Sequence, residues 1–278
     1  RTVYFQTVPS NYLETALWLE ADRMGFLLDA VTSEKFENQR EVVKNEKYQM
    51  QVSRQYGMSY EILGQSLYPP SHPYNWPVIG YVDDLYRASL EDLKNFFLRW
   101  YGPNNAILTI TGDVNSETVI PLVEKYFGSI PRGSEVRKLS PMVPRISSDI
   151  YTGYTDNVYL PMTDIVFPTV PNYHRDEAAL DILASLMGDG KNSIFYKNFI
   201  KSEKAIQASV SHPCRELSGE FHFTVLTFPD WQEDQGVYFN NIEADIRNSI
   251  ADWEEKGFSE EDLEMVKTKI ISQNYDMI

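Results

Sequence analysis

A short segment at residues 132–147 divides the sequence into two parts that repeat the same pattern of predicted structure. Its composition is charged and interrupted by helix breakers, as is typical of a linker. Those breakers are Gly133, Pro141 and Pro144. On both sides, runs of β-branched and aromatic residues alternate with long segments of helical periodicity. We therefore expect two α+β domains, at 1–131 and 148–278, each with an antiparallel sheet covered on one face by long helices.

The first part is predicted to contain two strands, at 2–8 and 107–114, among several helices. One predicted helix begins at Ser10, and further helices are predicted at 33–55, 60–67, 89–100 and 116–127. Ser89 and Asp92 have the S-x-x-D spacing of a capping box, which fixes the start of one of them.

The second part is predicted to contain more strands. They lie at 149–156, 158–168, 205–212 and 219–228, and the last two form a hairpin with Ser218 near its turn. Helices are predicted at 172–187, 192–203, 231–256 and 259–276, the last opened by a cap of Ser259 and Asp262. Too few strands are predicted for two complete sheets, so we expect both domains to continue outside this sequence.

Composition excludes several classes of function. The net charge is −15, which argues against binding nucleic acid, because phosphates are neutralised by Lys and Arg. An acidic surface is compatible with peptide partners. No run of apolar residues approaches the roughly 20 that a membrane helix needs, so we expect no membrane span in this segment.

Cys214 is the single cysteine, which excludes an internal disulfide and a cysteine-based zinc site. His212 lies two residues away, on the same face of a predicted strand. Nothing in the sequence indicates an activated nucleophile, and a small core residue is the simpler interpretation.

The four histidines, at 72, 174, 212 and 222, form no H-E-x-x-H motif. The sequence from His174 to Ala178 nearly matches the inverted motif H-x-x-E-H, but Ala178 replaces the second histidine. One imidazole cannot make a catalytic zinc site, which needs three protein ligands. We interpret His72, with Tyr74 and Trp76, as packing residues of a proline-rich loop.

Glu46 is the carboxylate whose position is most unusual. On the predicted helix 33–55, Phe36, Val43 and Met50 recur every seven residues, and Glu46 falls on that apolar seam. A carboxylate there is costly unless it is paired or bound to a cation. Spacing alone leaves two interpretations open, a metal ligand or a partly exposed residue whose stem packs.

The whole chain resembles the insulinase/pitrilysin family of zinc metallopeptidases. The matching segments are RTVYFQTVPSNYLETALWLEADRM (1–24), EKFENQREVVKNEK (34–47), SLYPPSHPYNWPVIG (66–80), YGPNNAILTITGDV (101–114), VEKYFGSIP (123–131) and HRDEAALDILASLMGDGKNSIFYKNF (174–199).

The resemblance implies one zinc ion in the intact protein. In the family, an upstream H-x-x-E-H helix supplies two histidine ligands and the general base, and a Glu in a segment like R-E-V-V-K-N-E supplies the third ligand. That Glu is Glu46 here. A family Glu that helps to position the metal corresponds to Gln39, a departure from the pattern. We expect the H-x-x-E-H to precede Arg1, so this segment should contain no catalytic residue and be inactive alone.

The resemblance also implies a metalloendopeptidase that hydrolyses peptides or short unfolded proteins in a chamber. A second homologous half, fused or separate, would complete that chamber. The alternative is a non-catalytic family member that acts as a partner or structural subunit of a peptidase-like complex. A third interpretation is a peptide-binding module without metal. Similar bacterial members are often exported to the periplasm, the compartment that we expect.

Overall fold

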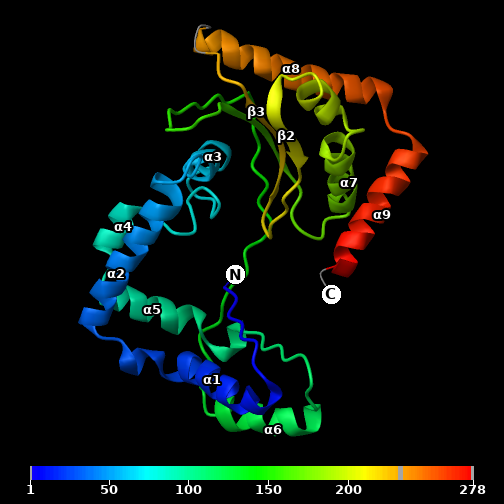
Figure 1. Ribbon diagram of the computed structural model, residues 1–278. Helices are drawn as coiled ribbons and strands as arrows, with labels where there is room; N and C mark the ends of the chain where they lie inside the picture. Colours follow the sequence, from blue (N-terminus) through cyan, green and yellow to red (C-terminus); the bar gives the residue numbers. More distant parts are fainter. Residues whose placement is uncertain (1, 231–233, 277–278) are drawn as a thin grey trace. The chain divides into compact units, whose positions relative to one another are not determined.

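The computed structural model describes residues 2–230 and 234–276 and is drawn in Figure 1. Contacts divide the chain into two compact units. The first unit joins 1–50 with 78–138, and the second joins 51–77 with 139–278. Each unit is therefore built from two separate stretches of sequence. The predicted division into 1–131, a linker and 148–278 stays a prediction.

The first unit is helical. Its helices are α1 (Leu13–Ala30), α2 (Ser33–Lys47), α4 (Val82–Arg87), α5 (Leu90–Trp100) and α6 (Ser116–Phe127), with 3-10 turns at Ser10–Tyr12 and Pro103–Asn105. Helix α1 packs on α6, and its residues Leu17 and Ala21 are buried. Across this contact, Glu14 accepts hydrogen bonds of 2.7 Å from Lys125 and from the Tyr126 hydroxyl. The predicted capping box at Ser89 and Asp92 is confirmed.

Two strand predictions in the first unit are wrong. The structure shows irregular backbone at 2–8 and at 107–114, and the described residues of this unit contain no strand. A strand exists only when its backbone is hydrogen-bonded to a neighbour, and β-branched composition alone does not supply that partner. Helix α2 also ends earlier than predicted, at Lys47, and continues as a π-helix, Tyr48–Val52.

The second unit is α+β, as predicted. Its elements are α3 (Ser59–Leu67), β1 (Met162–Thr169), α7 (Glu177–Gly188), a π-helix (Tyr196–Ile200), β2 (Ala205–Ser211), β3 (Gly219–Thr227), α8 (Gln235–Lys256) and α9 (Glu260–Asp276). The strands form an antiparallel sheet in the order β1-β3-β2. The β2–β3 hairpin and the Ser259–Asp262 cap are confirmed.

Helices α7 and α8 and the π-helix cover one face of this sheet (Figure 1). Alternate residues of β3 point to that face and enter a core whose fully buried members include Phe195, Phe199, Val225 and Ile246. The large apolar side chains on this face explain why the sheet and helices assemble here, since they remove the greatest apolar area from water.

Other boundaries in the second unit differ from prediction. Residues 149–156 are irregular rather than a strand, and β1 begins only at Met162, where pairing with β3 begins. Helix α7 starts at Glu177, because the preceding residues form turns that include Tyr173 with a φ of 64°. The first residues of the predicted helix 231–256 lie outside the described residues; α8 is described from Gln235.

Candidate functional site

Glu46 lies in the last turn of α2, and its side chain is exposed. The predicted apolar seam holds only in part: Phe36 and Val43 are half-buried, but Met50 is 57% exposed. The reason is the π-helix that begins at Tyr48, because its wider turn ends the helical phase that the sequence pattern assumed. Within the described residues, the Glu46 carboxylate makes no hydrogen bond or ion pair and is free to accept a ligand.

Three cationic side chains fasten another side of α2 to the chain at 80–88. The Arg40 guanidinium donates to the carbonyls of Leu85 and Ala88, the latter at 2.8 Å. Lys47, which is 5% exposed, donates to the Gly80 carbonyl at 2.7 Å. The Lys44 ammonium lies 4.4 Å from the centre of the Tyr86 ring. Spaced i, i+4 and i+7, these groups fix the rotation of α2 about its axis.

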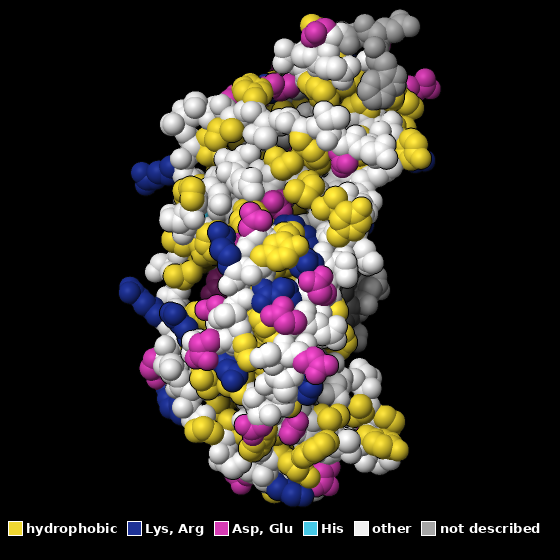
Figure 2. All heavy atoms as spheres, turned by 90° about the vertical axis from the view of Figure 1, so that its left-hand side faces the viewer, with side chains coloured by type: hydrophobic (Ala, Val, Ile, Leu, Met, Phe, Trp, Pro, Cys, Tyr) yellow, Lys and Arg dark blue, Asp and Glu magenta, His cyan; other side chains and the backbone are white. Residues whose placement is uncertain are grey.

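Gln39 is exposed on the same side of α2 as Glu46, seven residues earlier. Two helical turns separate them, about 10 Å along the axis, so Gln39 does not touch the Glu46 carboxylate. Figure 2, which views the molecule from the left of Figure 1, shows acidic and basic side chains interspersed, in keeping with the pairs Glu37–Arg40 and Glu41–Lys44 along α2.

Glu46 suits zinc as a single ligand. Its carboxylate is unengaged, it is held on an anchored helix, and carboxylate oxygen is a normal zinc donor. Among the described residues, no group of three His, Cys, Asp or Glu side chains could hold a metal ion. A catalytic zinc bound by Glu46, which needs three protein ligands, would therefore take at least one of them from outside these residues.

A buried ionic network occupies the sheet face opposite the helices. Glu220 of β3, 2% exposed, pairs with Arg215 and accepts a hydrogen bond of 2.7 Å from the Tyr68 hydroxyl. His222 bridges Glu220, at 3.1 Å, and Asp164 of β1, at 3.0 Å. No pattern in the sequence indicates this network, because Tyr68 and Asp164, which complete it around Glu220 and His222, are distant in the chain.

The network changes the protonation of its members. Burial opposes the charge on His222, but hydrogen bonds to Asp164 and Glu220 outweigh burial and raise its pKa to about 9. Burial also disfavours the Glu220 carboxylate, yet hydrogen bonds from His222 and Tyr68 lower its pKa. His222 is therefore a cation between two anions at neutral pH, a combination that stabilises buried charge.

The proline-rich loop after α3 packs against this network. The His72 ring stacks on Tyr68 with centroids 4.5 Å apart and bonds to the Met142 carbonyl at 2.8 Å. The Tyr74 amide donates to the other His72 nitrogen at 3.0 Å, so His72 is neutral. Arg215 lies 3.9 Å from the centre of the Tyr74 ring. The predicted packing role is right for these two residues, whereas Trp76 is 44% exposed.

Cys214 and His212 come close together, with Sγ 3.6 Å from Nε2, and Asp181 accepts from His212 Nδ1 at 2.7 Å. The thiol nevertheless donates to the Val170 carbonyl, at 3.2 Å. Burial, together with Glu177 and Asp181, raises the pKa of Cys214 to about 11. A thiol held protonated in this way is not a nucleophile at neutral pH, and His174 lies apart near the start of α7, beside Asp176.

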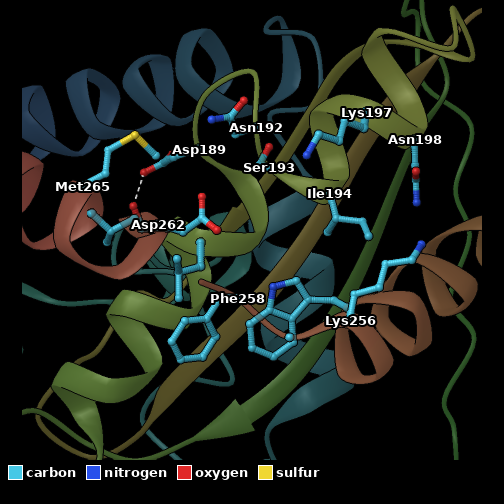
Figure 3. A pocket seen from close by; sticks show the side chains of 15 residues that line it. Asp189, Asn192, Ser193, Ile194, Lys197, Asn198, Lys256, Phe258, Asp262 and Met265 are labelled. Atoms are coloured by element: carbon cyan, nitrogen blue, oxygen red, sulfur yellow. Dashed lines mark hydrogen bonds between the residues drawn. The ribbon is translucent and has the colours of Figure 1, made fainter. Parts of the chain in front are cut away.

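The second unit also contains a pocket of about 390 Å³, shown in Figure 3. It lies where the end of α7, the π-helix at Tyr196–Ile200, the end of α8 and the start of α9 meet. Its apolar side includes Trp253 and Phe258, whose rings stack with centroids 6.0 Å apart. Lys197 and Asn192 lie on the opposite side in this view. The sequence offered no sign of this pocket.

Comparison with known proteins gives concordant results. Residues 87–270 match the family described as "Peptidase M16 inactive domain". The chain is 30% identical over 214 residues to the zinc protease PqqE of Helicobacter pylori, a match that covers 76% of this chain and 48% of that protein. This chain thus spans about half the length of that relative.

Solved structures agree with this fold. A protease from Helicobacter pylori superposes with a TM-score of 0.81 at 27% identity, covering 97% of this chain and 63% of the other. The first half of the periplasmic protease PqqL from Escherichia coli has a TM-score of 0.68 at 16% identity, covering 98% and 57%, and so supports the fold alone. No helix among the described residues is long and apolar enough to span a bilayer. From its sequence match and its fold, this chain belongs to the M16 peptidases, the insulinase/pitrilysin family.

Proposed function

We propose that this chain is part of a zinc-dependent metalloendopeptidase and supplies Glu46 as one of the zinc ligands. The other ligands and the general base would lie on an H-x-x-E-H helix outside residues 1–278. The substrates would be peptides or short unfolded proteins, enclosed with the help of a second homologous half that is fused or separate.

The observation that carries this proposal is the state of the Glu46 side chain. It is exposed and unengaged among the described residues, whereas the opposite arrangement, an ion pair with a neighbour, is found for Glu37 and Glu41 on the same helix. The π-helix that follows adds support, because such interruptions are frequent at functional sites. A relative named as a zinc protease points the same way.

Bound zinc would lower the pKa of a water molecule to about 7 and polarise the scissile carbonyl. The contribution of this chain is to hold one carboxylate in a fixed direction. Arg40, Lys44 and Lys47 hold α2 from one side and leave the Glu46 side of the helix open.

The test is zinc content and peptidase activity of the intact protein, with and without Glu46→Gln. We expect about one zinc per chain, loss of at least 90% of it in Glu46→Gln, and loss of turnover. Glu34→Gln is the matched control, because Glu34 is an exposed carboxylate on the same helix and should retain both. Full zinc and activity in Glu46→Gln would overturn the assignment.

The second candidate is a non-catalytic subunit that pairs with an active partner or serves as a structural part of a complex. The description of the matched family as an inactive domain favours it. Two results would establish this alternative. The folded intact protein would bind no zinc, and peptidase activity would be measured only after it is mixed with a homologous partner.

For the compartment we propose the bacterial periplasm, because similar bacterial members of the family are often exported there, and the structurally similar PqqL of Escherichia coli is described as periplasmic. Fractionation of cells that express the protein from its natural start tests this. Recovery with cytoplasmic markers would contradict it.

A further inference from the structure

The pocket between α7, the π-helix at Tyr196–Ile200, α8 and α9 is separate in sequence from Glu46 and plays no part in the proposed zinc site. Its volume of about 390 Å³ falls in the range of small-ligand sites, about 300–1,000 Å³. Some polar groups of the pocket are engaged by neighbouring side chains, and others are not.

Both acidic groups of the pocket are engaged. Asp189 accepts a hydrogen bond from the Ser185 hydroxyl and forms a salt bridge with Lys269, with 2.7 Å between Nζ and Oδ2. Asp262 accepts from the Ser259 amide at 3.1 Å and from its hydroxyl at 2.6 Å, as the cap of α9. These two hydrogen bonds from Ser259 lower the pKa of Asp262. The charge of Lys197 also lowers that pKa, but by the smallest amount.

The donors are in a different state. Lys256 pairs with Asp252 at 3.0 Å. By contrast, the Lys197 ammonium and the Asn192 amide make no side-chain hydrogen bond or ion pair within residues 2–230 and 234–276. Lys197 extends into the pocket beside Ser193 in Figure 3. The pocket thus offers a cation and a neutral donor, while its two carboxylates are engaged.

The apolar wall completes the description of the ligand. Trp253 and Phe258 stack nearly parallel, at 19°, and Phe258 is 50% exposed. Met265 and Val266 of α9 also line the pocket. An aromatic or large aliphatic group would cover this wall and remove apolar area from water.

We propose that this pocket binds an apolar carboxylate, with the carboxylate at Lys197 and Asn192 and the apolar group on Trp253 and Phe258. The chemistry fits the C-terminal residue of a peptide that ends in an aromatic or large aliphatic side chain. It also fits a free aromatic carboxylic acid. The two sources share the recognition elements and differ in the rest of the ligand.

The experiment uses the intact protein labelled with 5-fluorotryptophan, with the Trp253 resonance identified by Trp253→Phe. The probes are N-acetyl-phenylalanine, its C-terminal amide, and a pentapeptide ending in Phe with a free or amidated terminus. We expect the free acids to shift the Trp253 resonance and to bind at least about tenfold more tightly than the amides, as a charge-assisted hydrogen bond predicts.

Lys197→Met should reduce the preference for acid over amide to about twofold. Lys201→Met is the matched control, an exposed lysine one turn further on that does not line the pocket, and it should keep the full preference. Tighter binding of the peptide than of N-acetyl-phenylalanine identifies a chain end as the natural ligand, and the reverse identifies a small acid. Equal binding of acid and amide, or no shift with any probe, overturns the proposal. These binding measurements do not depend on bound zinc, so their outcome is independent of the proposed zinc site.

Discussion

The Tyr68 hydroxyl donates a hydrogen bond of 2.7 Å to Glu220, although 152 residues separate them in sequence. Both residues are almost fully buried, at 2% exposure each. Tyr68 belongs to the loop after α3 and Glu220 to the central strand of the sheet. This hydrogen bond, with that of Arg215, attaches the early segment of the second unit to its sheet.

Tyr68→Phe should therefore destabilise the protein. The change removes one donor from a buried carboxylate and leaves the ring in place, so we expect a loss of about 1–3 kcal/mol in the free energy of unfolding. Urea denaturation measures it. Tyr173→Phe, which alters a side chain that is 99% exposed, should change stability by less than about 0.5 kcal/mol. A loss no larger than that of the control would show that the bond contributes nothing.

The dependence of stability on pH should reveal His222. Because hydrogen bonds to Asp164 and Glu220 overcome burial and raise its pKa to about 9, the stabilisation from its charged form is complete below the unfolded value of about 6.5. That stabilisation is lost as the pH rises through 9. We expect the unfolding free energy to decrease between pH 6.5 and 9.5, by on the order of 2–3 kcal/mol.

His222→Gln is the variant that isolates this effect. It should be less stable than the wild type at pH 6.5, and its stability should change much less between pH 6.5 and 9.5. The exposed His174 serves as the control, because His174→Gln should retain the wild-type slope. Identical slopes in the wild type and His222→Gln would contradict the assignment.

Gly64→Ala should destabilise the protein, although alanine favours helices by about 1 kcal/mol over glycine. A Cβ at Gly64, in α3, would lie 2.8 Å from the Tyr74 carbonyl oxygen and 3.2 Å from that of Asn75. These are backbone atoms, so the loop itself must move, at a cost of about 1–3 kcal/mol. Thermal unfolding measures the loss. Gly153→Ala, where nothing lies within 4 Å, should be tolerated.

Arg40→Met tests the anchoring of α2, and it rests on the proposed zinc site. Loss of the bonds to Leu85 and Ala88 should free the rotation of the helix that carries Glu46. We expect the dissociation constant for zinc in the intact protein to rise about tenfold, equivalent to 1.4 kcal/mol. Competition with a chelator measures it, and Arg40→Lys should recover part of the affinity. A less stable protein with unchanged zinc affinity would show that this anchor does not orient Glu46.

Features encoded by neighbouring residues could be predicted from the sequence. The caps at Ser89–Asp92 and Ser259–Asp262 depend on a spacing of three residues, and the β2–β3 hairpin depends on a short connection. The strands predicted at 2–8 and 107–114 failed because pairing is a property of a distant partner, which the local pattern does not contain.

The candidate site divides in the same way. Glu46 was identified from resemblance. The exposure of Met50, the last residue of the predicted apolar seam, could not be read from the pattern, because the π-helix at Tyr48–Val52 ends the α-helical phase before it. The network of Arg215, Glu220 and His222 was not predicted at all. A buried charge is recognisable only once its partners are placed around it, and two of them, Tyr68 and Asp164, lie more than 50 residues away in the chain.

The membership of residues 51–77 in the second unit has a consequence for the order of events during synthesis. This segment leaves the ribosome long before Glu220, the residue to which Tyr68 is bonded. Until β3 has been made, the aromatic rings of the loop have no surface to cover. The second unit therefore cannot finish folding stepwise behind the ribosome, and its early segment must wait, open to chaperones or to misfolding, for the sheet that receives it.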